Sequence, residues 1–429
     1  MKLKAIIGLV IAWGLMPFAG AYNTQGIASQ SIRQNHKAIM QQNSVVKPTY
    51  GESWLNRITI GGMGSIVGVV GNKDLPGSFS ERSSGSNLFV NNANLLADVD
   101  LGQYAQFSLN LAYLGAPSQW YMDDDTTLTP NVVSHRIFAD EAYVTFANFT
   151  QVPLFFKVGK AYVPFGEYSE HYVPWQIESP AQMLAESNGP TAIFGMSSNY
   201  GWYASIFALQ GETTPLNSKT NNLRNWGGKL GYSNNLGYFH SPDTKVNVNV
   251  SYIRNVWDSR IFTPNINSPQ TMTSSYSRNP VGGLSAHIDM SYKAFSAYAD
   301  WVTTLKDLQS TYSVTPIGSG SSKFWGANVN AAYAFETLAR DSSLGAGFQF
   351  SGNGEWFASS NDVKAKSEGT TSHGLFSLVI PKWRALVEYK VSLDKYADLG
   401  LVYAYSKSYD FGSNKRSTNI GLARVAVKF

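Results

Sequence analysis

The sequence predicts an all-β fold, a transmembrane antiparallel β-barrel, with sixteen strands as the first choice and eighteen as the alternative. Three observations predict it: apolar and polar residues alternate along most of the chain, charged residues are scarce, and aromatic residues are abundant. Only 14% of the residues are charged, against roughly 25% in an ordinary soluble domain. This composition favours a surface that faces something other than water.

The alternation has a period of two residues, which is typical of a β-strand with one apolar and one polar face. From Lys245 to Tyr252 the chain reads K-V-N-V-N-V-S-Y, so that the valines and Tyr252 share one face. Segments 106–113, 284–293 and 325–335 repeat this pattern. The polar faces carry Asn, Ser, Gly and Asp instead of the Lys and Glu of a solvated sheet, which favours an apolar face turned toward lipid.

Aromatic residues recur near the ends of these segments, as expected for girdles at the two membrane interfaces. The candidates are Tyr104, Tyr113, Trp202, Trp257, Trp301, Trp325 and Trp383. Inside a membrane every backbone polar group must be paired within the protein, so strands of this kind must close into a barrel.

Seventeen windows carry the strand pattern. They are 57–70, 88–101, 104–115, 136–148, 153–163, 191–199, 201–210, 224–233, 244–254, 281–293, 294–305, 323–335, 343–352, 370–380, 383–393, 397–407 and 417–429. A bacterial barrel with both chain ends in the periplasm needs an even number of strands, so one window is wrong. We expect the error in the last third, where residues 375–393 would form one strand bent at Pro381.

The connections between windows differ in length. Turns near Gly102, Gln151 and Gly201 are short and are predicted to be periplasmic. Long polar segments are predicted to be extracellular or to fold into the lumen, and residues 116–134 and 164–190 are examples.

The chain divides into three predicted parts. Residues 1–21 read as a signal peptide, in which a basic start precedes an apolar stretch and an A-x-A site predicts cleavage before Tyr22. Residues 22–52 form a polar periplasmic segment, which is either a short helix or coiled coil or a disordered stretch. Residues 53–429 form the barrel, in the bacterial outer membrane.

Several classes of function are excluded. The chain has no Cys, which excludes a disulfide framework, a thiolate metal site and a Cys nucleophile. A net charge of +4 is no signature of nucleic-acid binding. No G-x-S-x-G, H-E-x-x-H or phosphate loop is present and the six His are scattered, so we expect no enzyme, no cofactor and no metal site. Asp123-Asp124-Asp125 reads either as a divalent-cation site or as a solvated loop tip.

The stretch from Phe156 to Tyr168 reads F-K-V-G-K-A-Y-V-P-F-G-E-Y and resembles porin-like families related to phosphate-selective porins. With the preceding D-E-A-Y-V at 140–144, it is most similar to the LbtU-type siderophore porins of Legionella and its relatives. The resemblance is specific over two strands and the loop after them. It implies an outer-membrane route for a ferric siderophore without TonB and without a plug domain. A general or anion-preferring diffusion porin and a structural or adhesive barrel with a blocked lumen remain alternatives.

Ionisable residues on the predicted inner faces are candidates to line the lumen or to bind the solute. They are Glu141, Lys157, Lys160, Glu167, Lys245, His287, Asp289, Arg384, Lys390 and Arg424. Asp98, Asp100, Glu388 and Lys428 are further candidates to line the lumen. Lys160 and Glu167 are predicted to lie at the mouth. Lys157 is either paired with Glu141 inside the wall or selects the solute by its charge. Both signs occur, so a count does not give the ion preference.

The expected partners are outer-membrane lipid, the outer-membrane assembly machinery and a small polar solute, with the oligomeric state left open. We expect the assembly machinery as a partner because the last window ends on an aromatic residue, Phe429, as outer-membrane barrels typically do.

We expect Phe429→Asp to lower the amount of folded protein in the outer membrane, because it removes this aromatic residue and places a charge at the lipid interface. Immunoblots of outer-membrane fractions measure the amount, and heat-modifiable gel migration measures folding. Normal amounts with normal migration would count against this role of Phe429.

Overall fold

The computed structural model describes fifteen stretches of the chain. They are residues 58–71, 86–102, 104–114, 136–147, 152–167, 179–198, 200–211, 223–237, 243–259, 280–307, 323–353, 381–394, 396–407, 409 and 417–428. The predicted signal peptide, the polar segment 22–52, Asp123–Asp125 and Phe429 lie outside these residues.

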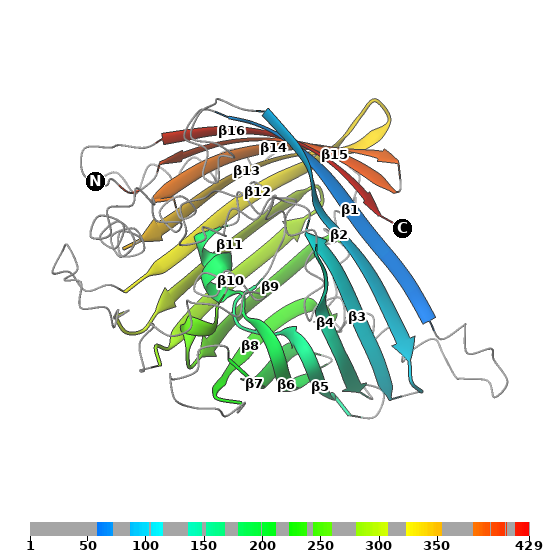
Figure 1. The fold of residues 1–429 in the computed structure, drawn as a ribbon, viewed down its shortest axis with the longest axis vertical. Coiled ribbons are helices and arrows are strands. Elements are labelled where there is room, and N and C mark those ends of the chain that lie inside the picture. The colour runs from blue at the N-terminus through cyan, green and yellow to red at the C-terminus, as the bar shows by residue number, and fades with distance from the viewer. Residues whose placement is uncertain are drawn as a thin grey trace.

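Sixteen antiparallel strands form one closed barrel, in which each strand pairs with its neighbours in sequence and β1 pairs with β16 (Figure 1). The strands are β1 (Ile58–Gly71), β2 (Ser86–Asp100), β3 (Ala105–Leu114), β4 (Arg136–Ala147), β5 (Leu154–Tyr162), β6 (Asn188–Ser197), β7 (Tyr200–Leu209), β8 (Asn225–Gly237), β9 (Thr244–Ile253), β10 (Gly283–Tyr292), β11 (Phe295–Thr304), β12 (Trp325–Thr337), β13 (Arg340–Gly352), β14 (Trp383–Asp394), β15 (Ala397–Lys407) and β16 (Ser417–Lys428). The predicted fold class and the count of sixteen strands are confirmed.

Sixteen of the seventeen predicted windows each overlap one of these strands. The remaining window, 370–380, lies outside the described residues. Because β13 pairs directly with β14, from Phe350 opposite Trp383 to Ser342 opposite Val391, the barrel closes without a strand from this window.

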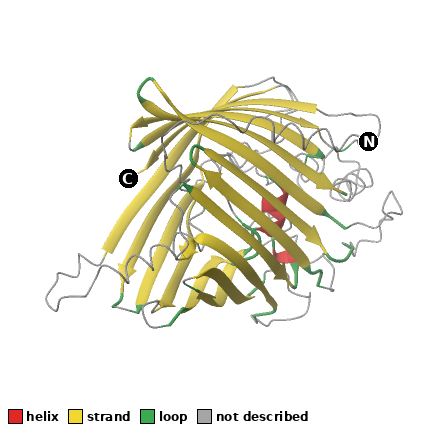
Figure 2. Cartoon of the chain, turned by 180° about the vertical axis from the view of Figure 1, so that it is seen from behind, coloured by secondary structure: helices red, strands yellow, loops and turns green. Residues whose placement is uncertain are grey.

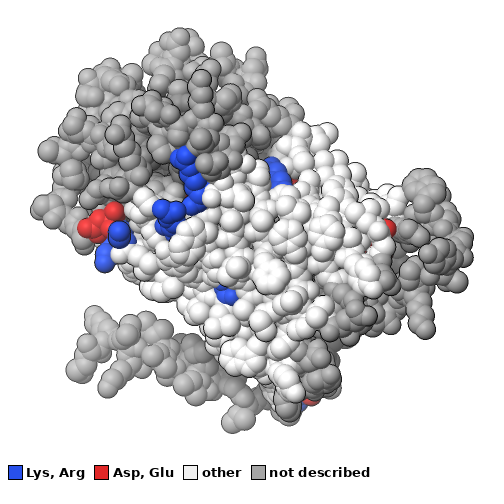
Figure 3. Space-filling model, turned by 90° about the horizontal axis from the view of Figure 1, so that it is seen from below, with Lys and Arg blue, Asp and Glu red and all other residues white. Residues whose placement is uncertain are grey.

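The outer face of the barrel is apolar. Side chains such as Ile206, Leu230, Val329 and Val387 are exposed there, and little charge appears on the described part of the face shown in Figure 3. These side chains face lipid, because they alternate with the residues that point into the barrel.

Aromatic residues mark both rims of this apolar band, as predicted. Tyr104, Trp202, Trp301 and Trp325 are exposed on the outer face. Trp257 is different, because only 1% of it is exposed and it lies in a short 3-10 helix, η3 (Val256–Asp258), inside the barrel. The prediction that Trp257 belongs to a girdle was wrong, since the chain after β9 turns inward instead of continuing along the wall.

The short connections lie at the end of the barrel where β1 begins and β16 ends, here called the termini end; the opposite end is the loop end. Gly102 and Gly201, in two of the predicted turns, have φ of 126° and 93°. This backbone conformation favours glycine, which has no Cβ to clash.

The connection between β5 and β6 enters the lumen. It carries a six-residue helix, α3 (Pro180–Ala185), whose N-cap Ser179 accepts a hydrogen bond from the backbone N–H of Gln182. The helix contacts β11, β12 and β13 and lies within the outline of the barrel in both views (Figure 2). No helix in the described stretches is long and apolar enough to cross a membrane.

An apolar cluster joins α3 to the inner wall, here called the lumen core. Its buried members are Phe155, Val163, Phe165, Ala181, Met183, Leu184, Ala185, Ile193, Phe207, Leu209, Ile253, Val256, Trp257, Val281, Val302 and Phe324. A water-filled barrel normally has a polar interior. The β5–β12 side of this lumen is therefore packed with protein, as the prediction that 164–190 folds inward allows.

We expect Gly326→Ala to destabilise the barrel, because a Cβ at Gly326 would lie 2.6 Å from the backbone N of Ala181 in α3. Overpacking of this kind costs about 1–3 kcal/mol. The matched control is Gly345→Ala on the neighbouring strand, where the nearest atoms lie at an ordinary 3.6 Å. The temperature of the heat-modifiable gel transition measures both; equal midpoints would argue against close docking of α3 on β12.

Candidate functional site in the barrel lumen

A belt of polar side chains runs around the inner face from β9 to β15. Its members lie directly opposite one another on successive strands, and they are Asn249, His287, Asp300, Asn328, Gln349, Arg384 and Ser406. All seven are buried although they point inward. This polar belt is therefore covered on its lumen side.

Hydrogen bonds join neighbours within the polar belt. Nδ1 of His287 lies 2.5 Å from Oδ1 of Asp300. Arg384 donates from Nε to Ser406 over 2.8 Å and from Nη1 to Gln349 over 3.0 Å. His287 and Arg384, two of the predicted site residues, thus point inward as expected but have partners in the wall.

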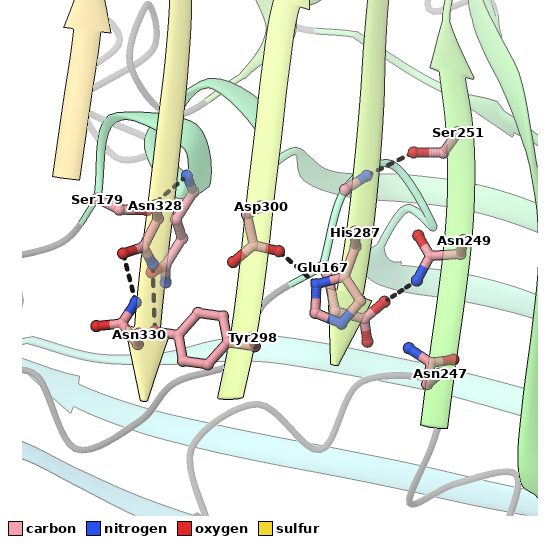
Figure 4. Close-up of polar contacts among 12 residues, drawn as sticks. Glu167, Ser179, Asn247, Asn249, Ser251, His287, Tyr298, Asp300, Asn328 and Asn330 are labelled. Atoms are coloured by element: carbon pink, nitrogen blue, oxygen red, sulfur yellow. Dashed lines mark hydrogen bonds and ion pairs between the residues drawn. The ribbon is translucent and has the colours of Figure 1, made fainter. Parts of the chain in front are cut away.

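An ion pair ties the segment after β5 to the wall near the polar belt. The Glu167 carboxylate lies 2.5 Å from Nζ of Lys229 on β8 and accepts a hydrogen bond of 3.2 Å from Nδ2 of Asn249. Lys229 also donates to the carbonyl oxygen of Gly166 over 2.9 Å, and the Gly166 N–H donates to Oγ of Ser251 over 2.8 Å. We call these contacts the clasp; Figure 4 shows Glu167 beside Asn249, with the His287–Asp300 pair on the neighbouring strands.

The prediction that Glu167 lies at the mouth was wrong. Glu167 is buried, because Val163 and Phe165 pack in the lumen core and draw the following residues inward. Its partner Lys229 was missed, although the sequence N-W-G-G-K-L-G-Y at 225–232 alternates and places Lys229 on the inner face. No local pattern links two residues that are 62 positions apart.

A second charged group lies on the inner wall of β14, β15 and β16. Nζ of Lys390 lies 3.3 Å from Oδ2 of Asp398. Gly400 on β15 lies opposite Lys390 on β14 and opposite Arg424 on β16. Because glycine has no side chain, no side chain separates these two cations. A Cβ at Gly400 would lie 3.8 Å from Oε1 of Glu388, which places this carboxylate over the gap. Lys390, Glu388 and Arg424 thus come together as inner-face residues.

A third charged group lies on the inner wall of β2 to β5. Nζ of Lys157 lies 4.0 Å from the centre of the Tyr143 ring, a cation–π contact. The register places Thr145 opposite Lys157. Glu141 lies four residues further along β4, and it attracts the ammonium group from a distance, as Asp98 does. The side chain is therefore only 4% exposed and rests on an aromatic ring instead of pairing directly with Glu141.

Three predicted site residues stand apart from these groups. Lys160 donates from Nζ to the carbonyl oxygen of Ala139 over 2.7 Å. Lys245 lies opposite Ser291, and Asp289 lies opposite Asn247, on the part of β9 and β10 nearest the termini end. The Lys428 side chain is not among those that the structure describes. Among the described residues, no group of three or more His, Asp or Glu could hold a metal ion.

A closed barrel with an apolar outer face and a polar inner face is the architecture of an integral protein of the bacterial outer membrane, because only closure pairs every backbone group in lipid. The fold is that of porins. It covers 87% of this chain in the outer membrane channel DcaP of Acinetobacter baumannii, with 97% of that chain covered, a TM-score of 0.53 and 13% identity.

Two further solved structures share the fold. An anion-selective porin from Comamonas acidovorans matches with a TM-score of 0.52 and 11% identity, over 87% of this chain and 99% of that one. OprB of Pseudomonas putida matches with a TM-score of 0.52 and 10% identity, over 87% and 95%. At these identities the likeness establishes the fold alone.

Sequence relatives carry the name UPF0422 protein. The one from Coxiella burnetii is 23% identical over 295 residues, which are 68% of this chain and 56% of the relative. One from Legionella pneumophila (strain Lens) is 22% identical over 243 residues, or 54% and 43%. The chain thus spans about half the length of these curated relatives. No protein-family model matches it.

We expect Lys229→Met to destabilise the barrel strongly, because it leaves the buried Glu167 carboxylate without its cation. Removing one partner of a buried pair costs about 3–5 kcal/mol. Equilibrium unfolding in urea with lipid vesicles measures the loss. The double variant Lys229→Met/Glu167→Gln should recover part of it, and a double variant as unstable as the sum of the two single variants would contradict the clasp.

Proposed function

We propose that this protein is a porin, a passive channel through which a small polar solute crosses the outer membrane. The observation that carries the proposal is the partial exposure of inward-pointing polar side chains on β2–β4 and β14–β16, such as Asp98, Glu141, Glu388 and Arg424. Side chains on the inner face of a closed barrel are reached by water only through its lumen. The likeness of the fold to porins supports the same reading.

The more specific proposal names a ferric siderophore as the solute. It is supported by the resemblance of residues 140–144 and 156–168 to siderophore porins. In this segment the chain leaves β5 and turns into the lumen as far as Glu167. A segment that is both recognisable in sequence and folded into the lumen narrows the lumen, and it can thereby influence which solute passes.

Reconstituted protein should raise the conductance of planar lipid bilayers in discrete steps and should make liposomes swell in isosmotic sugar or amino acid. Protein heated until its gel migration shifts is the control, because it has the same composition without the barrel. Bilayers with no conductance steps and liposomes with no swelling would favour a structural barrel with a blocked lumen.

The siderophore proposal has its own test. A deletion strain should lose growth on one ferric siderophore as sole iron source and regain it with the wild-type gene, while growth on inorganic iron stays unchanged. Equal growth of both strains on every siderophore tried would leave a diffusion porin as the better reading.

A further inference from the structure

We propose that the outer face of the barrel binds a phosphorylated glycolipid of the outer leaflet, through a patch at the loop end of β14, β15 and β16. The patch, here called the rim patch, consists of Trp383, Tyr403, Tyr405, Lys407, Ser417 and Asn419. Such a lipid carries phosphate groups on sugar rings, above several acyl chains. The inference concerns the face turned to lipid and does not depend on conduction through the lumen.

The loop end of the barrel faces the outer leaflet of the membrane. Residues 353–382 connect β13 to β14 at this end, whereas only Leu338 and Ala339 connect β12 to β13 at the termini end. In outer-membrane barrels the long connections are extracellular and the short turns are periplasmic. The rim patch therefore lies at the height of the outer headgroups, where phosphorylated glycolipids are found in this membrane.

The members of the rim patch point away from the lumen. Arg384, Ser406 and Ile420 alternate with them along the three strands, and all three are buried on the inner face. Tyr403 is 55% exposed, and its hydroxyl donates a hydrogen bond of 2.7 Å to Oδ1 of Asn419. Because polar groups are costly in hydrocarbon, these outward amide and hydroxyl groups mark the height at which the wall meets the headgroups.

Lys407 supplies the charge of the rim patch. It lies opposite Trp383 on β14 and opposite Ser417 on β16. Side chains directly opposite each other in a sheet have Cβ atoms about 5 Å apart. One phosphate group can therefore accept hydrogen bonds from the Lys407 ammonium and from the Ser417 hydroxyl together.

Aromatic rings form the surface beside Lys407. The Trp383 ring centre lies 5.3 Å from that of Tyr405 and 6.2 Å from that of Phe348. Phe348 in turn stacks on Phe350, with 5.3 Å between the ring centres. Such rings stay at a membrane interface, with apolar surface toward the acyl chains. They also present flat apolar faces on which a sugar ring packs, which favours a glycolipid over a plain phospholipid.

The charges around the rim patch favour an anion. The described carboxylates of β13–β16 lie at the termini end or on the inner face, and they are Asp341, Asp394, Glu388 and Asp398. The two connections beside the patch, 353–382 and 408–416, contain five Lys or Arg and four Asp or Glu. Their formal charges therefore do not offset the ammonium group of Lys407. A cation at the membrane surface attracts anionic headgroups.

The test is binding of diphosphoryl lipid A to the folded protein in neutral detergent micelles, counted by native mass spectrometry. Wild-type protein should bind it more tightly than dephosphorylated lipid A and more tightly than phosphatidylglycerol. Lys407→Gln should weaken the binding of diphosphoryl lipid A by about fivefold, the loss expected for one Lys at a lipid surface. Lys407→Arg should retain the binding, because it keeps the charge.

Ser417→Lys should tighten the binding, because it adds a second cation directly opposite Lys407. Without lipid A the same variant should have a lower melting temperature, since like charges opposite each other repel. A purely structural Lys407 would give the loss of stability without the gain in binding. Ser417→Lys also tests the inference if heat-modifiable migration shows that Lys407→Gln fails to fold.

Lys293→Gln is the matched control. Nζ of Lys293 lies 5.3 Å from the centre of the exposed Tyr292 ring, so it is also a cation beside an aromatic ring, but at the termini end. Its replacement should leave the binding of diphosphoryl lipid A unchanged.

Equal affinity of wild type and Lys407→Gln for diphosphoryl lipid A would overturn the inference. So would equal binding of phosphatidylglycerol, which would show attraction of any anionic lipid, or an equal loss of binding in Lys293→Gln. None of these results depends on conductance, so the proposed function stands or fails by its own test.

Discussion

The constraint on which the whole structure depends is the pairing of backbone N–H and C=O groups in lipid. An unpaired group in the hydrocarbon region costs several kcal/mol, so a sheet in a membrane cannot have a free edge. Here β1 pairs with β16 over nine residue pairs, from Met63 opposite Lys428 to Gly71 opposite Ile420, and this last pairing removes both edges. Once the sheet is closed, strand alternation sends every second side chain to lipid and the others to the lumen.

In the lumen the unfavourable contact is between apolar side chains and water, because the inner face of the barrel is partly apolar. Ile193, Phe207 and Leu209 point inward on β6 and β7, where water would otherwise contact them. The chain after β5 covers them with Phe165 and α3, and the buried clasp fixes that chain in position. Burial of apolar area supplies the driving force, whereas the charged hydrogen bonds select one orientation of the segment.

The strands could be predicted from the sequence because their signal is local. Alternation between neighbours located sixteen strands and put Lys157, His287 and Lys390 on the inner face, where the structure has them. It also marked window 370–380, which lies outside the described residues, and the direct pairing of β13 with β14 leaves no place for a strand between those two. A periodic pattern shows what a segment can form, and the partner strands decide whether it does.

The contacts within the lumen were not predictable, because they join distant parts of the chain. Glu167 meets Lys229 across 62 positions, and Trp257 leaves the wall only because the chain after β9 turns into the lumen core. The contact of Lys157 with Tyr143 was not predictable for a related reason, since the register offsets Glu141 along the barrel axis and places the ammonium group over the Tyr143 ring. Side-chain direction follows from alternation, but the choice of partner needs the register.

The difference between the direction of a side chain and its choice of partner also affects which solutes the lumen would favour. A count of inner-face charges treats Lys229 and Arg424 alike, although one is enclosed in the clasp and the other is partly exposed to the lumen. An enclosed ion pair presents little net charge to a passing ion, because its two fields nearly cancel at distances larger than their separation. The residues that set solute preference are therefore those that the folded lumen leaves accessible. In this barrel, two buried apolar clusters limit which charges these are, one around α3 and Phe165 and one on the inner face of β1 and β14–β16.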